Sequence, residues 1–134
     1  MRLEINHRER EGIAILDLKG RITAGEEVGA FRAAVEIATV ALAPNVILNL
    51  QLTEFIDSTG LGGMVMLATR IKQAGGAMKL TYLNRRNMEL IVLTKLDTIF
   101  QVFDDESDAV NSFFPDRTIK KFDILSFVRD LKDE

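Results

Sequence analysis

The residues of this chain best suited to chemistry lie in one short segment, residues 55–63, with the sequence Phe-Ile-Asp-Ser-Thr-Gly-Leu-Gly-Gly. An apolar stretch ends here, an acid and two hydroxyls follow, and glycines lead into a long helical pattern. The segment therefore places the hydroxyl of Ser58 where a helix begins. Such a serine can be a helix cap that stabilises the helix by about 1 kcal/mol. It can also be a phosphoacceptor, since a helix N-terminus tolerates the charge that a phosphate adds.

The residues that follow Ser58 predict a surface that another protein could contact. In the structural interpretation, Asp57 or Ser58 caps the helix and the glycines let the helix approach the sheet. In the functional interpretation, Gly60, Gly62 and Gly63 also leave the surface flat, so that a partner can come close. Met66 and Thr69 continue from Gly62 along the same predicted helix face and extend the patch.

The rest of the chain gives little support for catalysis. The only histidine, His7, lies in a predicted edge strand and is expected to be solvated, so a serine–histidine–acid triad with Ser58 is not indicated. The segment lacks the first glycine of a Gly-x-Ser-x-Gly elbow and the lysine of a P-loop. There is no cysteine, which excludes disulfides and zinc–cysteine sites. We therefore predict no catalytic residue and no cofactor.

The acidic run Asp104-Asp105-Glu106 offers two interpretations. It could bind a cation, or it could cap the following helix, whose N-terminus favours negative charge. We favour the cap, so no metal site is predicted.

Composition limits the class of protein further. The chain has 134 residues, which indicates one domain, and 47% of them are hydrophobic. Its 17 basic and 20 acidic residues give a net charge of -3, which disfavours nucleic-acid binding. The N-terminus shows no secretory signal and no apolar run is long enough to cross a membrane, so a cytoplasmic protein without membrane insertion is expected.

Strands alternate with helices along the chain, which favours an α/β fold with a mixed sheet. We expect four to five strands with about four helices packed beside them, forming a domain over residues 1–114, and an extra helix in a C-terminal extension, 115–134. The run 46–50 is expected to be a central strand, Gly20 to stop the strand before it, and Pro44 to end a helix. Strands are predicted at 3–8, 13–18, 46–50, 78–83 and 99–103, with a short further candidate at 21–23. Helices are predicted at 26–42, 58–73, 87–96, 105–113 and 122–131. These strands argue against an all-helical acyl carrier protein, which would attach phosphopantetheine to such a serine.

Residues 47–50 and 55–62 together resemble the signature of STAS domains, the bacterial anti-sigma factor antagonists. The resemblance extends to Gly20-Arg21-Ile22 and to residues 96–103, and covers roughly residues 3–114. It implies a binding protein rather than an enzyme, with Ser58 phosphorylated by an anti-sigma factor that is itself a serine kinase, and Thr59 as a second candidate acceptor. It also implies that the unphosphorylated form binds this kinase and frees a sigma factor, and that a serine phosphatase removes the phosphate.

The sequence departs from the family pattern at three positions. Asn49 replaces a common aspartate, Lys95 replaces a common glycine, and Thr23 replaces an acid in a region that faces the kinase. The predicted partner-binding residues are Thr23, Asp57, Ser58, Thr59, Gly60, Gly62, Gly63 and Met66. The alternative is a STAS module without kinase control, in a signalling assembly or a lipid-transport complex. Homodimer formation stays open.

Overall fold

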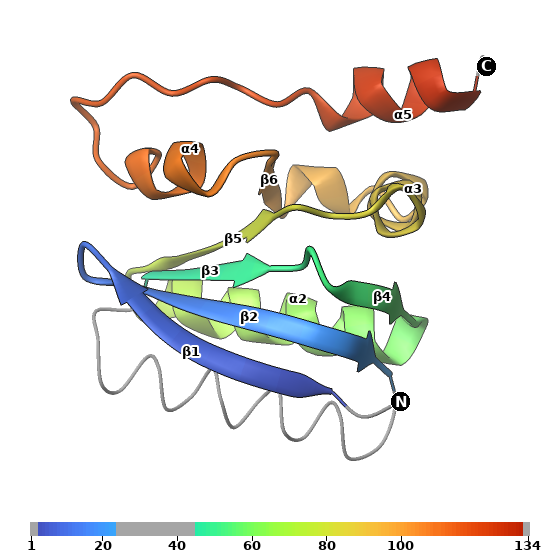
Figure 1. Ribbon diagram of the computed structural model, residues 1–134, viewed down its shortest axis with the longest axis horizontal. Coiled ribbons are helices and arrows are strands. Elements are labelled where there is room, and N and C mark those ends of the chain that lie inside the picture. The colour runs from blue at the N-terminus through green and yellow to red at the C-terminus, as the bar shows by residue number, and fades with distance from the viewer. Residues whose placement is uncertain (1–2, 24–44, 133–134) are drawn as a thin grey trace.

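The computed structural model describes residues 3–23 and 45–132, so the predicted helix at 26–42 and its end at Pro44 lie outside the described residues. The strands are β1 (Glu4–Arg10), β2 (Ile13–Ile22), β3 (Asn45–Asn49), β4 (Thr53–Ile56), β5 (Ala77–Thr81) and β6 (Gln101–Phe103). The helices are α2 (Ser58–Gln73), α3 (Arg85–Leu93), the short 3-10 helix η1 (Leu96–Thr98), α4 (Glu106–Asn111) and α5 (Ile124–Lys132). The predicted α/β fold with a mixed sheet is confirmed (Figure 1).

In the described residues the sheet has six strands, one more than the four to five expected: five follow the order β1-β2-β3-β5-β6, and β4 lies off this path and pairs with β2. The β1–β2 pair is antiparallel and the others are parallel. A two-residue turn joins β1 to β2, and both of its residues, Glu11 and Gly12, have positive φ angles (52° and 82°), as a type I′ hairpin turn requires. Strand β3 is central, as predicted: Val46, Ile47 and Leu48 are fully buried.

The prediction that Gly20 stops its strand is wrong. β2 pairs with β3 as far as Asp17 and runs beside β4 from Gly20, which has a φ of +119° and marks a shift in register against β4. The predicted separate strand at 21–23 is therefore the end of β2, which reaches Ile22. A glycine can adopt this backbone conformation without steric cost, so the strand bends there instead of ending.

Alternate residues of the strands build two cores, one on each face of the sheet. On one face, α2 packs its buried residues Leu61, Met64, Leu67 and Ile71 against Leu16, Leu48 and Leu80, and Ile91 of α3 joins them. Val65 and Ala68 of the same helix are only partly buried against this core. On the other face, Ala109 and Val110 of α4 cover Ile13, Ile15 and Ile47.

The predicted extra helix is present as α5, and the segment before it wraps around the sheet. Arg117 forms an ion pair with Glu11 at 2.7 Å, and Ile119 packs with the core under α4. Ile124 and Val128 then join the core on the opposite face, where α5 lies over α3 (Figure 1). The extension thus packs on its own domain.

The backbone conformation of Lys95 gives a physical reason for the glycine that the family pattern has at this position. Thr94 caps the C-terminus of α3, and Lys95 follows with φ +60° and ψ +23°, the left-handed conformation that glycine adopts at lowest cost. We predict that Lys95→Gly raises the free energy of unfolding by about 0.5–1 kcal/mol, measured by urea denaturation. The control is Lys95→Ala, which keeps the steric cost and should give no such gain; an equal gain would assign the effect to the lysine side chain instead.

Candidate functional site

The candidate phosphoacceptor lies where β4 ends and α2 begins. Asp57 is the N-cap: its backbone is extended and its carboxylate Oδ1 accepts a hydrogen bond from the Gly60 N–H at 2.7 Å. Ser58 is the first helical residue, and both Ser58 and Thr59 are exposed. Of the two residues we considered as cap, Asp57 fills the role, and the Ser58 hydroxyl is not needed for it.

Gly60 lets α2 approach the end of β2 closely. A Cβ atom at this position would lie 2.7 Å from the Ile22 carbonyl carbon and closer still to its oxygen. The same oxygen accepts a hydrogen bond from the Asp57 N–H at 3.2 Å. Only a residue without a side chain permits this contact, so Gly60 holds the start of the helix against the sheet.

The three glycines differ in exposure, which corrects the expected surface. Gly60 and Gly63 are buried, since they fall on the inward stripe of α2 with Met64 and Leu67, whereas Gly62 is exposed with no atom within 4 Å of an added Cβ. The expectation of a surface flattened by three glycines therefore holds for Gly62 alone. That Gly62 contacts a partner stays a prediction.

The other predicted partner-binding residues lie near or along the same helix. Thr23 is half-buried and follows Ile22, so it lies beside the start of α2. Met66 is half-buried and lies one turn after Gly62, and the exposed Thr69 donates its hydroxyl to the Val65 carbonyl at 2.9 Å. The fold thus brings Thr23, Asp57, Ser58 and Thr59 together, with Met66 farther along the helix.

Strand β4 is held from the α3 side by residues that we did not predict. The Asn84 amide donates to the carbonyls of Thr53 and Glu54 at 3.1 and 3.2 Å, and the buried Asn87 amide donates to Thr53 at 3.0 Å. Asn84 is also the N-cap of α3. An asparagine before a helical pattern signals a cap, but its second set of partners depends on tertiary structure.

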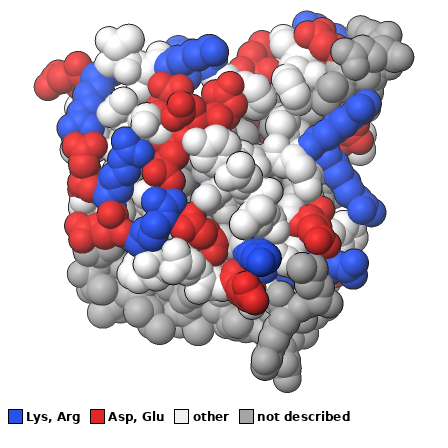
Figure 2. Space-filling view, viewed as in Figure 1, with Lys and Arg blue, Asp and Glu red and all other residues white. Residues whose placement is uncertain are grey.

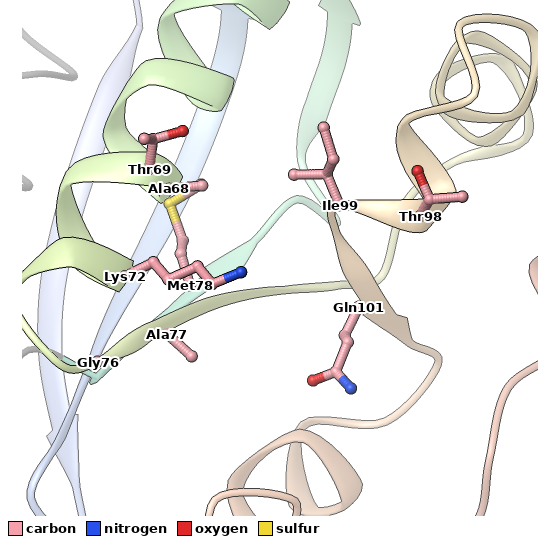
Figure 3. Close-up of a pocket in the computed structure, with 9 residues that line it drawn as sticks. All are labelled: Ala68, Thr69, Lys72, Gly76, Ala77, Met78, Thr98, Ile99 and Gln101. Carbon is pink, nitrogen blue, oxygen red and sulfur yellow. The ribbon is translucent and has the colours of Figure 1, made fainter.

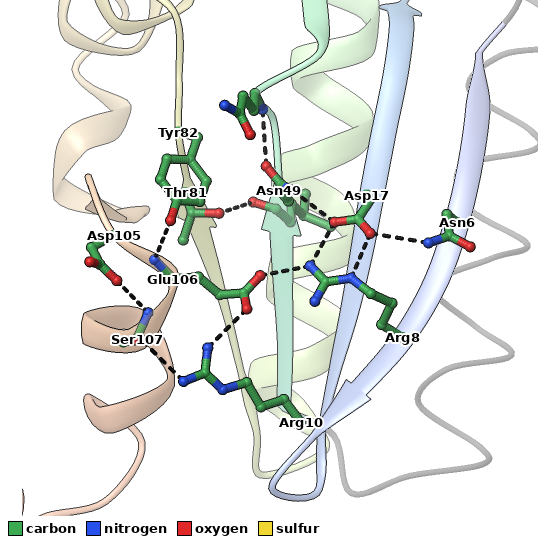
Figure 4. A network of polar contacts seen from close by, with 12 residues as sticks. Asn6, Arg8, Arg10, Asp17, Asn49, Thr81, Tyr82, Asp105, Glu106 and Ser107 are labelled. Atoms are coloured by element: carbon green, nitrogen blue, oxygen red, sulfur yellow. Dashed lines mark hydrogen bonds and ion pairs between the residues drawn. The ribbon is translucent and has the colours of Figure 1, made fainter.

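Asn49, which replaces a common aspartate of the family pattern, belongs to a polar network on the α4 face of the sheet (Figure 4). Its amide donates to Asp17 at 2.8 Å, and Arg8 donates to the same carboxylate at 2.6 and 2.8 Å. Arg8 also reaches Glu106 at 2.6 Å, and Arg10 reaches it at 2.9 Å. The Arg8 hydrogen bonds lower the pKa of both Asp17 and Glu106. Asn49 therefore donates a hydrogen bond to Asp17, which an ionised carboxylate at this position could not do.

The acidic run before α4 serves as a cap, as we favoured. The Asp105 carboxylate accepts a hydrogen bond from the Ser107 N–H at 2.6 Å, and Tyr82 accepts one from the Glu106 N–H at 3.0 Å. In the described part of the chain, no group of three or more histidine, cysteine or acidic residues could hold a metal ion. None of the helices in that part is long and apolar enough to cross a membrane.

A cavity of about 440 Å³ lies at the C-terminal half of α2, between that helix, the start of β5 and η1 (Figure 3). Lys72, Met78 and Gln101 are among the residues that line it. Ser58 lies at the opposite end of α2, so this cavity is separate from the candidate phosphoacceptor.

The family model of the STAS domain matches residues 4–109, about four-fifths of the chain. The chain belongs to the STAS domain family. The extension from residue 115 lies outside the matched residues, so a domain boundary at 114 stays a prediction. A search of the curated proteins gives no match.

Solved structures share this STAS fold. The proposed anti-sigma factor antagonist TM1081 of Thermotoga maritima is 25% identical, with a TM-score of 0.75 over 81% of this chain and 92% of that one. An anti-sigma factor antagonist from Mycobacterium paratuberculosis is 19% identical, with a TM-score of 0.72 over 82% and 92%. The Bacillus cell-fate determinant SpoIIAA in its phosphorylated form is 16% identical, with a TM-score of 0.63 over 82% and 99%. The last two are similar in fold alone.

The contact at Gly60 predicts opposite effects for two alanine substitutions in the same helix. Gly60→Ala should lower the free energy of unfolding by about 1–3 kcal/mol, because the new methyl group meets the Ile22 carbonyl. Gly62→Ala should raise it by about 0.5–1 kcal/mol, because its site is open and alanine favours a helix. Urea denaturation measures both. Equal effects of the two substitutions would contradict the close approach of α2 to β2.

The polar network predicts a pH-dependent effect of Asn49→Asp. At neutral pH the variant should lose about 1–3 kcal/mol of stability, because two carboxylates then meet where an amide donated to Asp17. Repulsion raises the pKa of this pair in the folded state, so the loss should shrink towards about pH 4, where one carboxyl takes up a proton. In the wild type, the lowered pKa of Asp17 means that stability is instead lost as the pH falls through that pKa.

The matched control is Asn6→Asp, since Asn6 also donates to Asp17, at 3.2 Å and in an exposed position. It should cost less because solvent screens the two charges. The measurement is urea denaturation of both variants and the wild type across this pH range. A loss for Asn49→Asp that does not change with pH would contradict the account of the network.

Proposed function

We propose that this chain is an anti-sigma factor antagonist that works as a phosphorylation-gated binding switch. In this proposal the unphosphorylated form binds an anti-sigma factor serine kinase and so releases a sigma factor for transcription. The kinase phosphorylates Ser58, the complex dissociates, and a serine phosphatase restores the binding form. The observation that carries the proposal is the exposed Ser58 at the first position of α2, with the cap supplied by Asp57.

The geometry supports the proposal because the fold can carry a phosphate there. The Ser58 side chain is exposed, and the cap hydrogen bond to Gly60 comes from Asp57. A phosphate at a helix N-terminus is favoured by the helix dipole and by N–H groups without helical partners. Phosphorylation would therefore change the charge that a partner meets while the domain keeps its fold.

The effect on a partner would be large. A phosphoserine carries nearly two negative charges at neutral pH, close to the Asp57 carboxylate. A charge enclosed at an interface without a counter-charge costs several kcal/mol, enough to dissociate a typical regulatory complex. Thr23, Thr59, Gly62 and Met66 are the neighbouring residues proposed to contact the partner, and Thr59 is the second candidate acceptor.

The family likeness supports a binding role in place of an enzymatic one. TM1081 and SpoIIAA are described as anti-sigma factor antagonists, and SpoIIAA is also known in a phosphorylated form. The one histidine of the sequence, His7, is exposed on β1, and Ser58 lies at the start of α2. A cytoplasmic location, where such kinases and sigma factors act, is part of the proposal.

The proposal predicts where the kinase places its phosphate. Wild type, Ser58→Ala and Thr59→Ala are incubated with an anti-sigma factor serine kinase from the same organism and ATP, and the phosphorylated residue is mapped by mass spectrometry. Phosphate is expected on Ser58 in the wild type and in Thr59→Ala, and on no residue in Ser58→Ala. Phosphate on Thr59 alone would make Thr59 the phosphoacceptor and contradict the assignment of Ser58.

A Ser58→Asp variant separates binding from folding. It should unfold at the same free energy as the wild type or up to about 1 kcal/mol higher, because the acid lies at a helix N-terminus. Its affinity for the kinase should fall at least about tenfold. Full affinity in this variant, together with an unmodified Ser58 after kinase treatment, would favour a STAS module without kinase control.

A further inference from the structure

A cavity of about 340 Å³ opens beyond the carboxyl ends of the three neighbouring parallel strands β3, β5 and β6. Gln51 follows the end of β3, Tyr82 follows β5, and Asp104 follows β6, and all three residues line the cavity. Met88 of α3 and Phe122 of the C-terminal extension line it as well. In open α/β sheets, ligands bind at this position, outside the carboxyl ends of the strands.

The cavity combines one acid with partly accessible aromatic residues. Asp104 is exposed, and it is the one charged side chain among the residues that line the cavity. Among the described residues, neither the Asp104 carboxylate nor the Gln51 side-chain amide has a hydrogen-bond or ion-pair partner. Tyr82 and Phe122 are half-buried, so part of each remains accessible. The side of the molecule seen in Figure 2 has a broad uncharged area in its middle, with charged side chains on both sides of it.

Tyr82 is held in a costly backbone conformation at the edge of this cavity. Its φ is +58°, which is rare for a bulky residue, and its hydroxyl accepts the hydrogen bond from the Glu106 N–H at 3.0 Å. Its own N–H donates to the Phe103 carbonyl at 3.2 Å. Such strain persists where the surroundings impose it, and it is concentrated at sites that bind ligands.

We propose that this cavity binds a small organic cation, an ammonium or guanidinium group on an aromatic or aliphatic body. The charge pairs with the Asp104 carboxylate, the Gln51 amide oxygen accepts a hydrogen bond from it, and the body contacts Tyr82, Met88 and Phe122. Aromatic rings attract cations through their faces, and a cavity of this size suits a small molecule. An anionic ligand would meet the Asp104 carboxylate with no basic residue among the lining residues to offset it.

The site joins the extension to the domain, because Phe122 belongs to the segment that leads into α5. Phe122 also packs against Phe127 of α5, with the ring centroids 5.5 Å apart. A bound cation therefore adds contacts between the extension and the carboxyl ends of β3 and β6. This inference does not depend on phosphorylation of Ser58.

Three probes of the same shape and different charge test the site. The full chain is titrated with phenethylamine, phenethyl alcohol and phenylacetate, and backbone amide shifts are followed by heteronuclear NMR. Phenethylamine should give saturable shifts at Gln51, Tyr82 and Asp104, with a dissociation constant on the order of 1 mM. The alcohol should bind about tenfold more weakly, and phenylacetate should cause no saturable shift at these residues.

Two variants decide whether the carboxylate carries the preference. Asp104→Asn should reduce the affinity for phenethylamine about tenfold, to that of the alcohol, whereas Asp116→Asn, an exposed acid outside the cavity, should leave it unchanged. Both positions are exposed, so neither variant should unfold. Equal binding of all three probes, saturable shifts elsewhere on the protein, or an unchanged affinity in Asp104→Asn would overturn the proposal.

Discussion

The contact between the first turn of α2 and the end of β2 determines the rest of the candidate site. One backbone carbonyl, that of Ile22, accepts the Asp57 N–H and lies directly against Gly60. A side chain at residue 60 would push the helix away from the strand, and the cap at Asp57 would move with it. Because Asp57 supplies the cap at this end of α2, the Ser58 hydroxyl is not needed for it, and the Ser58 side chain is exposed.

Two other features of the fold position β2 and β4 for that contact. Gly20 lets β2 bend away from β3, so that its last residues run beside β4. From the other side, the Asn84 and Asn87 amides hold the Thr53 carbonyl and fix β4 against α3. The two polypeptide segments that meet at Ser58 are thus positioned by backbone contacts and amides, which leaves the exposed side chains free to serve a partner. The C-terminal extension packs α5 on α3, the helix that carries Asn87 and is capped by Asn84.

Periodicity in the sequence predicted the elements that are long or strongly apolar. α2 and the extra helix at the C-terminus were predicted because their apolar residues repeat with the period of a helix, and the central strand because it is a compact apolar run. Strand β4 was missed because it has only four residues and includes the exposed Glu54. Gly20 signals both a strand end and a bend, and only the pairing with β4 distinguishes them.

The site was predictable in type but not in detail. Ser58 at a helix start was evident from residues 55–63, and its role as phosphoacceptor came from the family resemblance. Which of Asp57 and Ser58 caps the helix, which glycines are buried, and why Asn49 lies beside Asp17 depend on contacts between segments distant in sequence. Local sequence carries no signal for such contacts.

The central claim is that phosphate on Ser58 changes partner binding while the fold is retained. The most direct measurement is calorimetric titration of one anti-sigma factor kinase with the unmodified chain and with the fully Ser58-phosphorylated chain, with amide spectra of both recorded in parallel. The account predicts that the phosphorylated chain binds at least about a hundredfold more weakly while amide shifts change only near the start of α2. Equal affinity of the two forms, or loss of binding accompanied by unfolding of the domain, would contradict it.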